Sequence, residues 1–478
     1  MDAGQQRSCR ASALPEGGSR GHSLALSNEA RRHAAAFARR RARRSLTGTL
    51  RPPSIFTSGS NDEGGAAVKI SMFHLMPYRD LPADFEQRYH SVWVDPPWWE
   101  LADAERVGQY YNWTLDELTY AARAGLDGIC TNEHHQNAYG FMPSPNLMGS
   151  ALAKATNGLD VAVVQMGSTL PTTNPPIRVA EEYAMLDCIS GGRLVAGMPL
   201  GTPMDVNYCY GIPPMEQRER YREAHDLIIK AWTSREIFAW NGKYWQLPMV
   251  NPWPRPIQQP HPPVWVPGSG SITTWDFAID HEHCYCFLSY FGWQAALGVV
   301  DGYWNRVQEK GKDMNPYRLG FLQLVVVSET DARAEEDYGR HVEYFYHKCL
   351  HVAREFAFPP GHHDWESLVA MVRRGGLGGL TSLNLREMGF RDFVKQGCVI
   401  AGSPETVRDQ LREVIKRLRV GNLMVLLHIG SMPHELTLKN IDLFAREVLP
   451  HLRHIWDDEG WENHWWPQRL RSTPQHVG

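Results

Sequence analysis

The chain has 478 residues and a net charge of −4, with 43% hydrophobic and 21% charged residues. This composition is typical of a soluble globular protein, and the length favours one large barrel with extensions over one small domain. The charge argues against a general nucleic-acid binder, and no apolar run reaches the roughly 18 residues that a membrane span needs.

The cysteines are scattered along the chain, and none has C-x-x-C spacing. In a chain of this size the pattern indicates reduced thiols in a cytoplasmic protein and not a disulfide framework. The eight positions are Cys9, Cys130, Cys188, Cys209, Cys284, Cys286, Cys349 and Cys398.

Residues 1–66 are rich in arginine, serine, glycine and alanine and poor in acids. We expect a disordered or dispensable arm, because such a segment cannot bury enough apolar surface to fold. Two other interpretations stay open: an organelle transit peptide, which shares this composition, and a true start further downstream.

The first predicted elements are a strand at 68–74, a helix, and a second strand that runs to Glu133. Thr114 with Glu117 three residues later predicts the start of the helix, and Gly125 its end. An Asn-Gly turn at 241–242 predicts a two-stranded excursion. The further strands are expected at 159–167, 193–198, 264–266, 284–288, 319–327 and 423–428, and the further helices include 146–156, 176–189, 216–232 and 434–452.

Eight strand–helix repeats predict an α/β fold, a (β/α)8 TIM barrel with insertions, over residues 67–456. Residues 355–402 interrupt the alternation and carry dense glycines at 373–379, so we interpret this insertion as a candidate lid. The tryptophan-rich tail, 457–478, is expected to pack on the barrel or on a partner subunit.

Glu133, His134 and His135 stand at the C-terminal end of the second predicted strand, where barrel enzymes place their chemistry. Neighbouring side chains of an extended segment point to opposite faces, so only one of the two histidines can face the site. A carboxylate beside an imidazole suits acid/base catalysis; the alternative is a hydrogen-bonded histidine of the core.

A second candidate site follows the fifth predicted strand, where small and hydroxylic residues open a helix. Such residues let backbone amides approach a ligand, and the helix N-terminus favours an anion such as a phosphate. The stretch is neither a Walker A loop nor a dinucleotide fingerprint. Its members are Gly268, Ser269, Gly270, Ser271 and Thr273.

His281, His283, Cys284 and Cys286 form a possible metal-ligating cluster. No second cluster at zinc spacing accompanies them, and we therefore predict no metal site.

Taken together, four stretches resemble the bacterial luciferase-like flavin-dependent monooxygenases, in the same order and at similar spacing. The resemblance covers about 68–456, and its third and fourth stretches are its most specific parts. The stretches are Glu133-His134-His135 with Tyr139, Gly140 and Asn146; 167–175; 180–194; and 402–406 with the helix that follows.

The resemblance implies a TIM barrel that binds reduced FMN at its C-terminal face. The flavin would react with O2 to give a C4a-hydroperoxide that oxidises a small organic substrate, and a separate reductase would supply the reduced flavin. His134 would act as acid/base, with Glu133 beside it. A non-prolyl cis peptide at Met166–Gly167 would lie beside the flavin ring, and Ser269 to Thr273 would hold its phosphate.

One departure leaves the cofactor open. The family's phosphate-binding arginine is missing after the fourth strand, where this chain has Met198-Pro199-Leu200-Gly201. Backbone amides and hydroxyls, or an arginine from elsewhere, would then hold FMN. The alternative is the deazaflavin F420 and hydride transfer on the same barrel.

Two other functions are a metal-dependent barrel hydrolase and a non-catalytic flavin-binding or subunit-assembly protein. The aromatic residues of 92–113 favour an apolar substrate. Members of the family are commonly dimers or larger, so we expect a homo-oligomer that binds neither nucleic acid nor a membrane.

Overall fold

The computed structural model describes residues 67–471 apart from 289, 363–364, 366–368 and 370–384. The predicted arm, 1–66, lies outside the described residues, as do the glycine-rich stretch at 373–379 and the last residues of the tail, 472–478.

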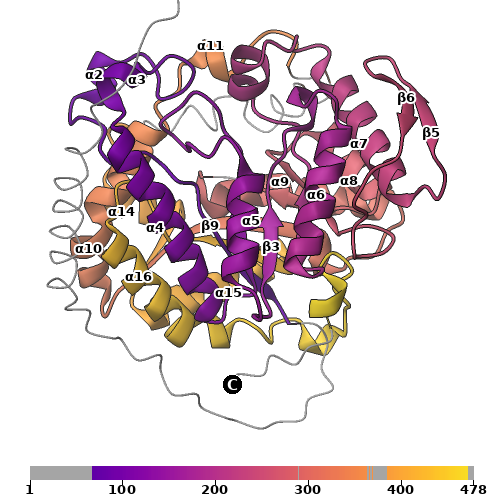
Figure 1. The fold of residues 1–478 in the computed structure, drawn as a ribbon. Coiled ribbons are helices and arrows are strands. Elements are labelled where there is room, and N and C mark those ends of the chain that lie inside the picture. Colours follow the sequence, from indigo (N-terminus) through magenta and orange to yellow (C-terminus); the bar gives the residue numbers. More distant parts are fainter. Residues whose placement is uncertain (1–66, 289, 363–364, 366–368, 370–384, 472–478) are drawn as a thin grey trace, which may run out of the picture. The chain divides into compact units, whose positions relative to one another are not determined.

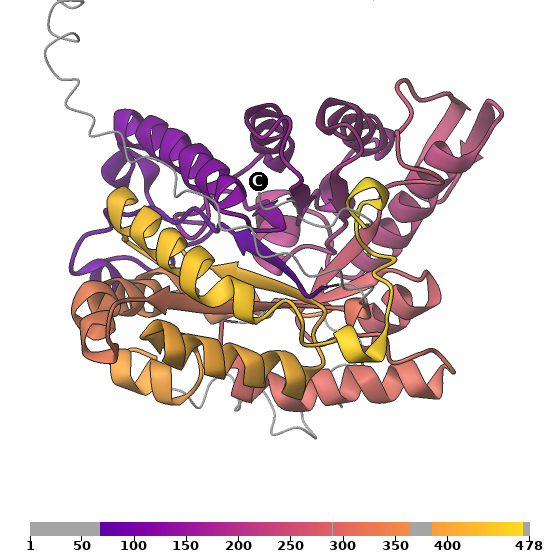
Figure 2. The same ribbon diagram turned by 90° about the horizontal axis from the view of Figure 1, so that it is seen from below.

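Eight parallel strands close a barrel in the order β9, β11, β1, β2, β3, β4, β7 and β8, and β8 pairs with β9 to complete the ring. Figures 1 and 2 show helices surrounding these strands, as expected for alternating strands and helices. The predicted (β/α)8 barrel is therefore confirmed. The strands are β1 (Lys69–Phe73), β2 (Gly128–Thr131), β3 (Ala162–Gln165), β4 (Leu194–Gly197), β7 (Val264–Gly268), β8 (Cys284–Phe287), β9 (Leu319–Val327) and β11 (Asn422–Leu426).

The strands are short and almost wholly buried, because helices cover their outer face and side chains fill the interior. All nine residues of β9 are buried. The parallel register places the C-terminal ends of the strands at one face of the barrel, so residues just after β2, β3, β4 and β7 meet there.

The long helices between the strands match the sequence prediction at most of their bounds. The predicted excursion is the antiparallel hairpin of β5 (Phe238–Asn241) and β6 (Gln246–Val250). The helices of the barrel are α5 (Pro145–Ala155), α6 (Ile177–Ser190), α7 (Gln217–Thr233), α8 (Ile272–Asp280), α9 (Gly292–Glu309), α10 (Asp331–Tyr344), α15 (Pro404–Leu418) and α16 (His434–Leu443).

The predicted start of the first long helix is wrong. Helix α4 runs from Ala104 to Arg123, and the Asp103 carboxylate caps it by accepting the amides of Glu105 and Arg106 at 2.9 and 3.1 Å. Thr114 is fully buried in the middle of this helix. An aspartate cap satisfies the free amides of a first turn, as a Thr-x-x-Glu box does.

The last residues of the predicted insertion, 399–402, belong to the barrel wall. Strand β10 (Val399–Gly402) pairs in parallel with Leu324–Val327, the C-terminal half of β9, and the short helix α14 (Phe390–Lys395) precedes it. The N-terminal half of β9 pairs with β8 on the same edge. Strand β10 therefore extends the wall at the C-terminal rim, beyond the end of β8.

The tail packs against the end of the barrel where the strands begin, opposite the C-terminal rim. Trp466 is 1% exposed, and its ring lies 6.0 Å from that of Trp265, while the Trp465 carbonyl accepts a hydrogen bond of 2.9 Å from Trp265 Nε1. A Cβ added at Gly128, the first residue of β2, would lie 3.1 Å from Trp466. The tail thus covers the side where the strands begin.

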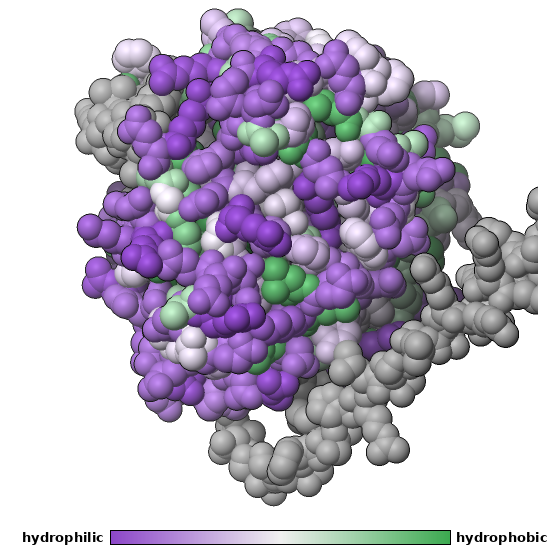
Figure 3. Space-filling model, turned by 90° about the vertical axis from the view of Figure 1, so that its left-hand side faces the viewer, coloured by the Kyte–Doolittle hydropathy of each residue, from purple (hydrophilic) through white to green (hydrophobic). Residues whose placement is uncertain are grey.

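Within the described residues, no helix combines the length and the apolar character that crossing a membrane requires. Figure 3, which shows the left-hand side of the view in Figure 1, displays a mostly hydrophilic surface with small, separate hydrophobic patches. The cysteines among the described residues are all free.

Candidate functional site

His134 and Asp205 form a hydrogen-bonded pair at the C-terminal face of the barrel. His134 follows β2, and its Nδ1 lies 2.9 Å from Asp205 Oδ2. Asp205 is only 1% exposed and comes from η2 (Met204–Cys209), the π-helical turn after β4. A carboxylate at Nδ1 places the imidazole proton there and leaves Nε2 to exchange a proton with a substrate.

Several donors hold the Asp205 carboxylate in place. Its Oδ1 accepts the indole N–H of Trp93 at 3.1 Å and the amide of His135 at 2.8 Å, and its Oδ2 accepts the Thr202 hydroxyl at 3.0 Å. A buried carboxylate is tolerated when its oxygens are hydrogen-bonded in this way. The pair with His134 is therefore fixed before any ligand arrives.

Aromatic side chains surround the His134 ring. Trp93 and Tyr139 stack on each other at 4.5 Å, and their rings lie 4.8 and 5.1 Å from that of His134 in edge-on geometry. Both side chains are buried. They limit the rotation of the imidazole and keep water from one side of it.

Glu133 pairs with the other histidine. Its Oε1 lies 2.8 Å from His135 Nε2, and its Oε2 accepts the Thr169 amide at 2.6 Å. Burial lowers the pKa of His135, but the hydrogen bond and the charge of Glu133 outweigh that effect and raise it above its usual value. The two adjacent histidines thus turn to two different carboxylates, and Glu133 orders the loop after β3.

Met166 and Gly167 lie at the end of β3, beside Glu133. The Met166 amide donates to the Thr131 carbonyl at 2.8 Å. A Cβ at Gly167 would lie 3.3 Å from Pro199 and 3.4 Å from Glu133, so this glycine permits a close approach of three loops.

The predicted cis peptide at Met166–Gly167 is wrong. The cis bonds of the described residues precede Pro175, Pro254 and Pro260, and all three are therefore prolyl bonds. Proline lowers the energy difference between cis and trans, which a glycine at position 167 does not do.

The predicted anion loop lies at the end of β7. Gly268 closes the strand, Gly270 has the positive φ of 107° that favours glycine, and Ser271 precedes the first turn of α8. Ser269 lies between the two glycines. The loop therefore leads directly to the N-terminus of α8, where the helix dipole favours an anion.

Arg218, from the first turn of α7, lies over this helix terminus. Its guanidinium donates to the Thr273 hydroxyl at 2.8 Å and to the Ser271 hydroxyl at 3.3 Å. Arg218 and Thr273 border a small pocket that also includes Leu200. A guanidinium, two hydroxyls and a helix N-terminus fit a phosphate group. Helix α7 thus places an arginine beside the predicted anion loop, whereas residues 198–201 contain none.

The segment from Leu200 to Arg218 connects the two parts of the site. Gln217 Nε2 donates to the carbonyls of Leu200 and Gly201 at 3.0 and 3.1 Å, which anchors α7 to the end of β4. Asp205 belongs to the same segment. One segment therefore carries both the partner of His134 and the arginine that lies at the N-terminus of α8.

Sequence reasoning missed Asp205, Arg218 and Trp93. Asp205 had a usable signal, since a carboxylate in the loop after a barrel strand faces the functional end. Arg218 had none: it is one of three arginines in the alternating run Arg218-Glu219-Arg220-Tyr221-Arg222. Trp93 was noticed only as one of many aromatic residues in its loop.

The four residues of the predicted metal cluster separate in space. Cys284 and Cys286 are buried within β8, with their Sγ atoms 3.9 Å apart, and a Cβ at Gly320 would lie 2.7 Å from Cys286 Sγ. His281 and His283 lie just before the strand and face His225 of α7. The four residues therefore do not form one site.

The chain is similar to several known enzymes. It is 27% identical to the oxygenase component of the flavin-dependent trigonelline monooxygenase of Acinetobacter baylyi, over 49% of this chain and 64% of that protein. It is 24% identical to 2,5-diketocamphane 1,2-monooxygenase 1 of Pseudomonas putida, over 72% of this chain and 94% of that protein. The chain thus spans less than two thirds of the first relative and almost all of the second.

Solved structures share the fold. The oxygenating constituent of 3,6-diketocamphane monooxygenase of Pseudomonas putida, a type II Baeyer–Villiger monooxygenase in complex with FMN, matches with a TM-score of 0.58 at 19% identity, over 80% of this chain and 98% of that one. An F420-dependent secondary alcohol dehydrogenase matches with a TM-score of 0.54 at 18% identity, over 81% of this chain and 99% of that one.

The family model described as luciferase-like monooxygenase matches residues 99–420, which is most of the barrel. The match includes His134, Asp205, Arg218 and the anion loop. The chain therefore belongs to the luciferase-like monooxygenases.

Proposed function

We propose that the protein is a monooxygenase that uses reduced FMN and O2 to oxidise a small, apolar organic substrate. The observation that carries this proposal is the hydrogen-bonded cluster of Arg218, Ser271 and Thr273 after the end of β7. It offers the charge and the hydroxyls that a flavin phosphate needs, on a barrel of the luciferase-like family.

The residues of the chain have separate roles in this reaction. Arg218, Ser271 and Thr273 would hold the phosphate, with the backbone of Gly268, Ser269 and Gly270 leading the loop to it. The residues at the end of β3, Met166 and Gly167, would lie near the ring system. Reduced FMN, when bound there, supplies the two electrons that activate O2.

His134 exchanges a proton with the substrate at Nε2, while Asp205 holds the ring and stabilises its protonated form. Trp93 and Tyr139 keep water from the ring. Glu133 acts through His135 and Thr169, which makes it a positioning residue and not the proton acceptor of His134.

The relatives support a two-component system. The trigonelline enzyme is named as an oxygenase component, which implies a second component, and the diketocamphane enzyme is called an oxygenating constituent. We infer that a separate flavin reductase supplies the reduced flavin to this protein as well. A homo-oligomer and a cytoplasmic location remain predictions.

A second candidate is F420-dependent hydride transfer. The F420-dependent dehydrogenase has the same barrel, and the pocket of Arg218 would accept a phosphate of either cofactor. A metal-dependent hydrolase has less support. Within the described part of the chain, the only group of three metal-ligating side chains within reach of one another is His225, His281 and His283, which excludes Glu133 and His134.

The test is a titration of the full chain, under anaerobic conditions, with reduced FMN and with reduced F420. We expect saturable binding of reduced FMN, followed by rapid reoxidation of the flavin when O2 is admitted, coupled to product formation from a cyclic ketone or a similar apolar substrate. Binding of F420 in preference to FMN, with no reaction with O2, would establish hydride transfer instead.

A further inference from the structure

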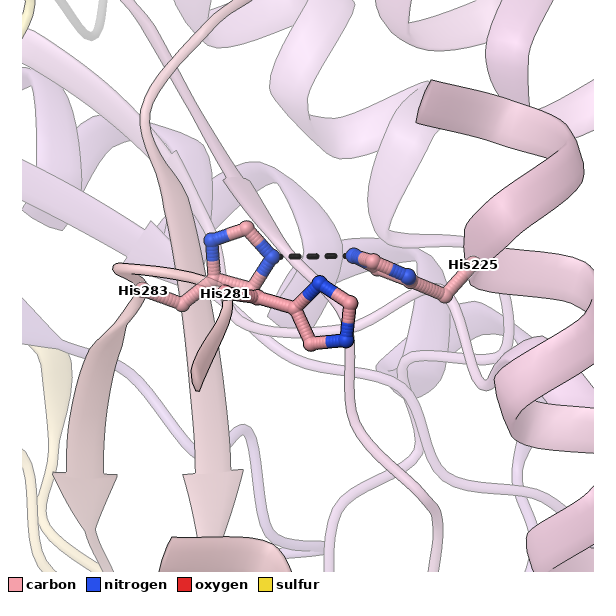
Figure 4. Close-up of side chains that lie close together, drawn as sticks. All are labelled: His225, His281 and His283. Atoms are coloured by element: carbon pink, nitrogen blue, oxygen red, sulfur yellow. Dashed lines mark hydrogen bonds between the residues drawn. The ribbon is translucent and has the colours of Figure 1, made fainter. Parts of the chain in front are cut away.

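Three histidines meet beside the start of β8, at the end of the barrel opposite His134. His225 comes from α7, and His281 and His283 come from the turn between α8 and β8 (Figure 4). The ring centroids of His225 and His281 lie 4.6 Å apart, and those of His225 and His283 lie 5.1 Å apart. One nitrogen from each ring lies within 4.8 Å of the others.

The hydrogen bonds of this group define its protons. His225 Nδ1 lies 2.9 Å from Asp226 Oδ1, and a carboxylate there holds the proton on Nδ1 and leaves Nε2 with a lone pair. His283 Nε2 lies 2.9 Å from that lone pair and must donate to it. Two nitrogens that face each other in this way need either a proton or a cation between them.

Asp226 also resembles a common support of metal sites. A histidine that ligates a metal usually donates its other N–H to a carboxylate, which fixes the ring and makes the ligating nitrogen more basic. The His225–Asp226 contact has this form. The metal-ligating group found among the described residues contains imidazoles alone, so it offers neutral nitrogen ligands to an ion.

Two of the three histidines are buried and one is exposed, so an ion could reach the group from solvent. His225 and His283 are 2% and 5% exposed, whereas His281 is exposed. The ring of Phe277 packs against His225 and His281 at 4.7 and 4.5 Å. Burial therefore fixes two of the ligands, His225 and His283, and the third lies at the surface against the same ring as His225.

The distances fit a tetrahedral ion after small movements. Zinc–nitrogen bonds of about 2.0–2.1 Å place two ligands of a tetrahedron roughly 3.3 Å apart. His225 Nε2 and His283 Nε2 are 2.9 Å apart, so they need to separate by only a few tenths of an ångström. His283 would move its proton from Nε2 to Nδ1, which keeps the ring neutral and frees the Nε2 lone pair for the ion.

We propose that His225, His281 and His283 bind one Zn²⁺ ion, with a water molecule as the fourth ligand. Imidazole nitrogen suits Zn²⁺ and its neighbours in the first transition row, whereas Mg²⁺ and Ca²⁺ require oxygen ligands. The site departs from the sequence prediction of no metal, because His225 lies 56 residues before His281 and only the fold brings α7 to this turn.

The ion would join α7 to the end of α8. These two helices also carry Arg218 and Thr273, which meet at their N-termini. His225 follows Arg218 by seven residues and His281 follows Thr273 by eight, so the site lies about two turns below the anion pocket on both helices. Bound Zn²⁺ would hold the two helices at a second point and stabilise the folded chain by mass action.

The test is calorimetric titration of chelator-treated full chain, without a polyhistidine tag, with ZnCl2 and with MgCl2. We expect one Zn²⁺ per chain, no Mg²⁺ binding, and a rise in melting temperature with Zn²⁺. The variants His283→Gln and His281→Gln should each weaken Zn²⁺ binding at least tenfold. Because His281 is exposed, His281→Gln should leave the fold intact even if His283→Gln does not.

The matched control is His454→Gln, since His454 is an exposed histidine at another part of the surface. This variant should bind Zn²⁺ as the parent chain does. Absence of a one-to-one Zn²⁺ site, or Zn²⁺ binding that is unchanged in His281→Gln, would overturn the proposal. Both outcomes can be read without flavin or substrate, and therefore do not depend on the proposed monooxygenase activity.

Discussion

Two groups of histidines lie at opposite ends of the same barrel and differ in their partners. At the C-terminal face, His134 and His135 each bind a carboxylate, Asp205 and Glu133. Beside the start of β8, His283 instead faces another imidazole, that of His225.

The difference shows how the surroundings decide what an imidazole can do. A carboxylate holds a proton on the ring and favours its charged form, which suits proton transfer. At the second group burial disfavours that charge, and the neighbouring imidazoles add to the effect, so that both hold the pKa of His283 well below its usual value. The second arrangement leaves lone pairs for an ion.

The largest expected effect comes from removing the carboxylate of the first group. Asp205→Asn should lower turnover by about 10²- to 10⁴-fold, because the amide no longer holds the proton on Nδ1 of His134. Binding of reduced FMN should change little. Stopped-flow kinetics with and without substrate would measure both. Asp442→Asn, on the surface of α16, is the control, and full turnover in Asp205→Asn would remove the proposed role of the pair.

Helix α7 contributes a residue to each of the two proposed binding sites, so a substitution at its first turn can test one site without the other. Arg218→Ala should weaken binding of reduced FMN by roughly 10- to 100-fold, since hydrogen bonds to charged groups contribute about 1.5–3 kcal/mol. Zn²⁺ binding at His225 should not change. Fluorescence titration would detect the loss, with Arg412→Ala as the control. Equal flavin affinity in both variants would place the phosphate elsewhere.

The His135–Glu133 pair should make stability depend on pH. The pKa of His135 is raised in the folded chain, so its contribution is complete below the unfolded value of about 6.5 and is lost as the pH rises through the folded value. Urea unfolding at pH 6 and pH 9 should show parent and His135→Gln differing by roughly 1–2 kcal/mol more at the lower pH. A difference that grows toward pH 9 would contradict this sign.

The smallest expected effect concerns the other nitrogen of His135. Tyr210 Oη lies 3.5 Å from His135 Nδ1, at the limit of a hydrogen bond, and the tyrosine is 47% exposed. Tyr210→Phe should therefore change the free energy of unfolding by less than about 0.5 kcal/mol. Urea titration would measure it, and a larger loss would mean that His135 needs two partners.

The barrel could be predicted because its signals are local. Each strand is a short apolar run between turn residues, and each helix has its own period and ends, so no contact between distant residues is needed to recognise them. His134 was found for the same reason, since it follows a strand directly. The predicted helix start at Thr114 was wrong because the segment contains two possible N-caps. Asp103, the earlier one, accepts the amides of the first helical turn.

The partners of the site could not be predicted, because they depend on which loops meet in space. Asp205 reaches His134 across 71 residues, and Arg218 reaches Thr273 across 55. Strand β10 could not be predicted for a related reason. Its four residues pair with the part of β9 that extends beyond the end of β8. Periodicity within a segment contains none of this information.

The tail that covers the start of the strands has a consequence for folding during synthesis. The last barrel strand, β11, pairs with β1, and Trp466 packs against Gly128 and Trp265. A chain that emerges from the ribosome at about 5–20 residues per second therefore exposes an open barrel until β11 has been made. The native core can be completed only after Trp466, which packs on Trp265, has also left the ribosome.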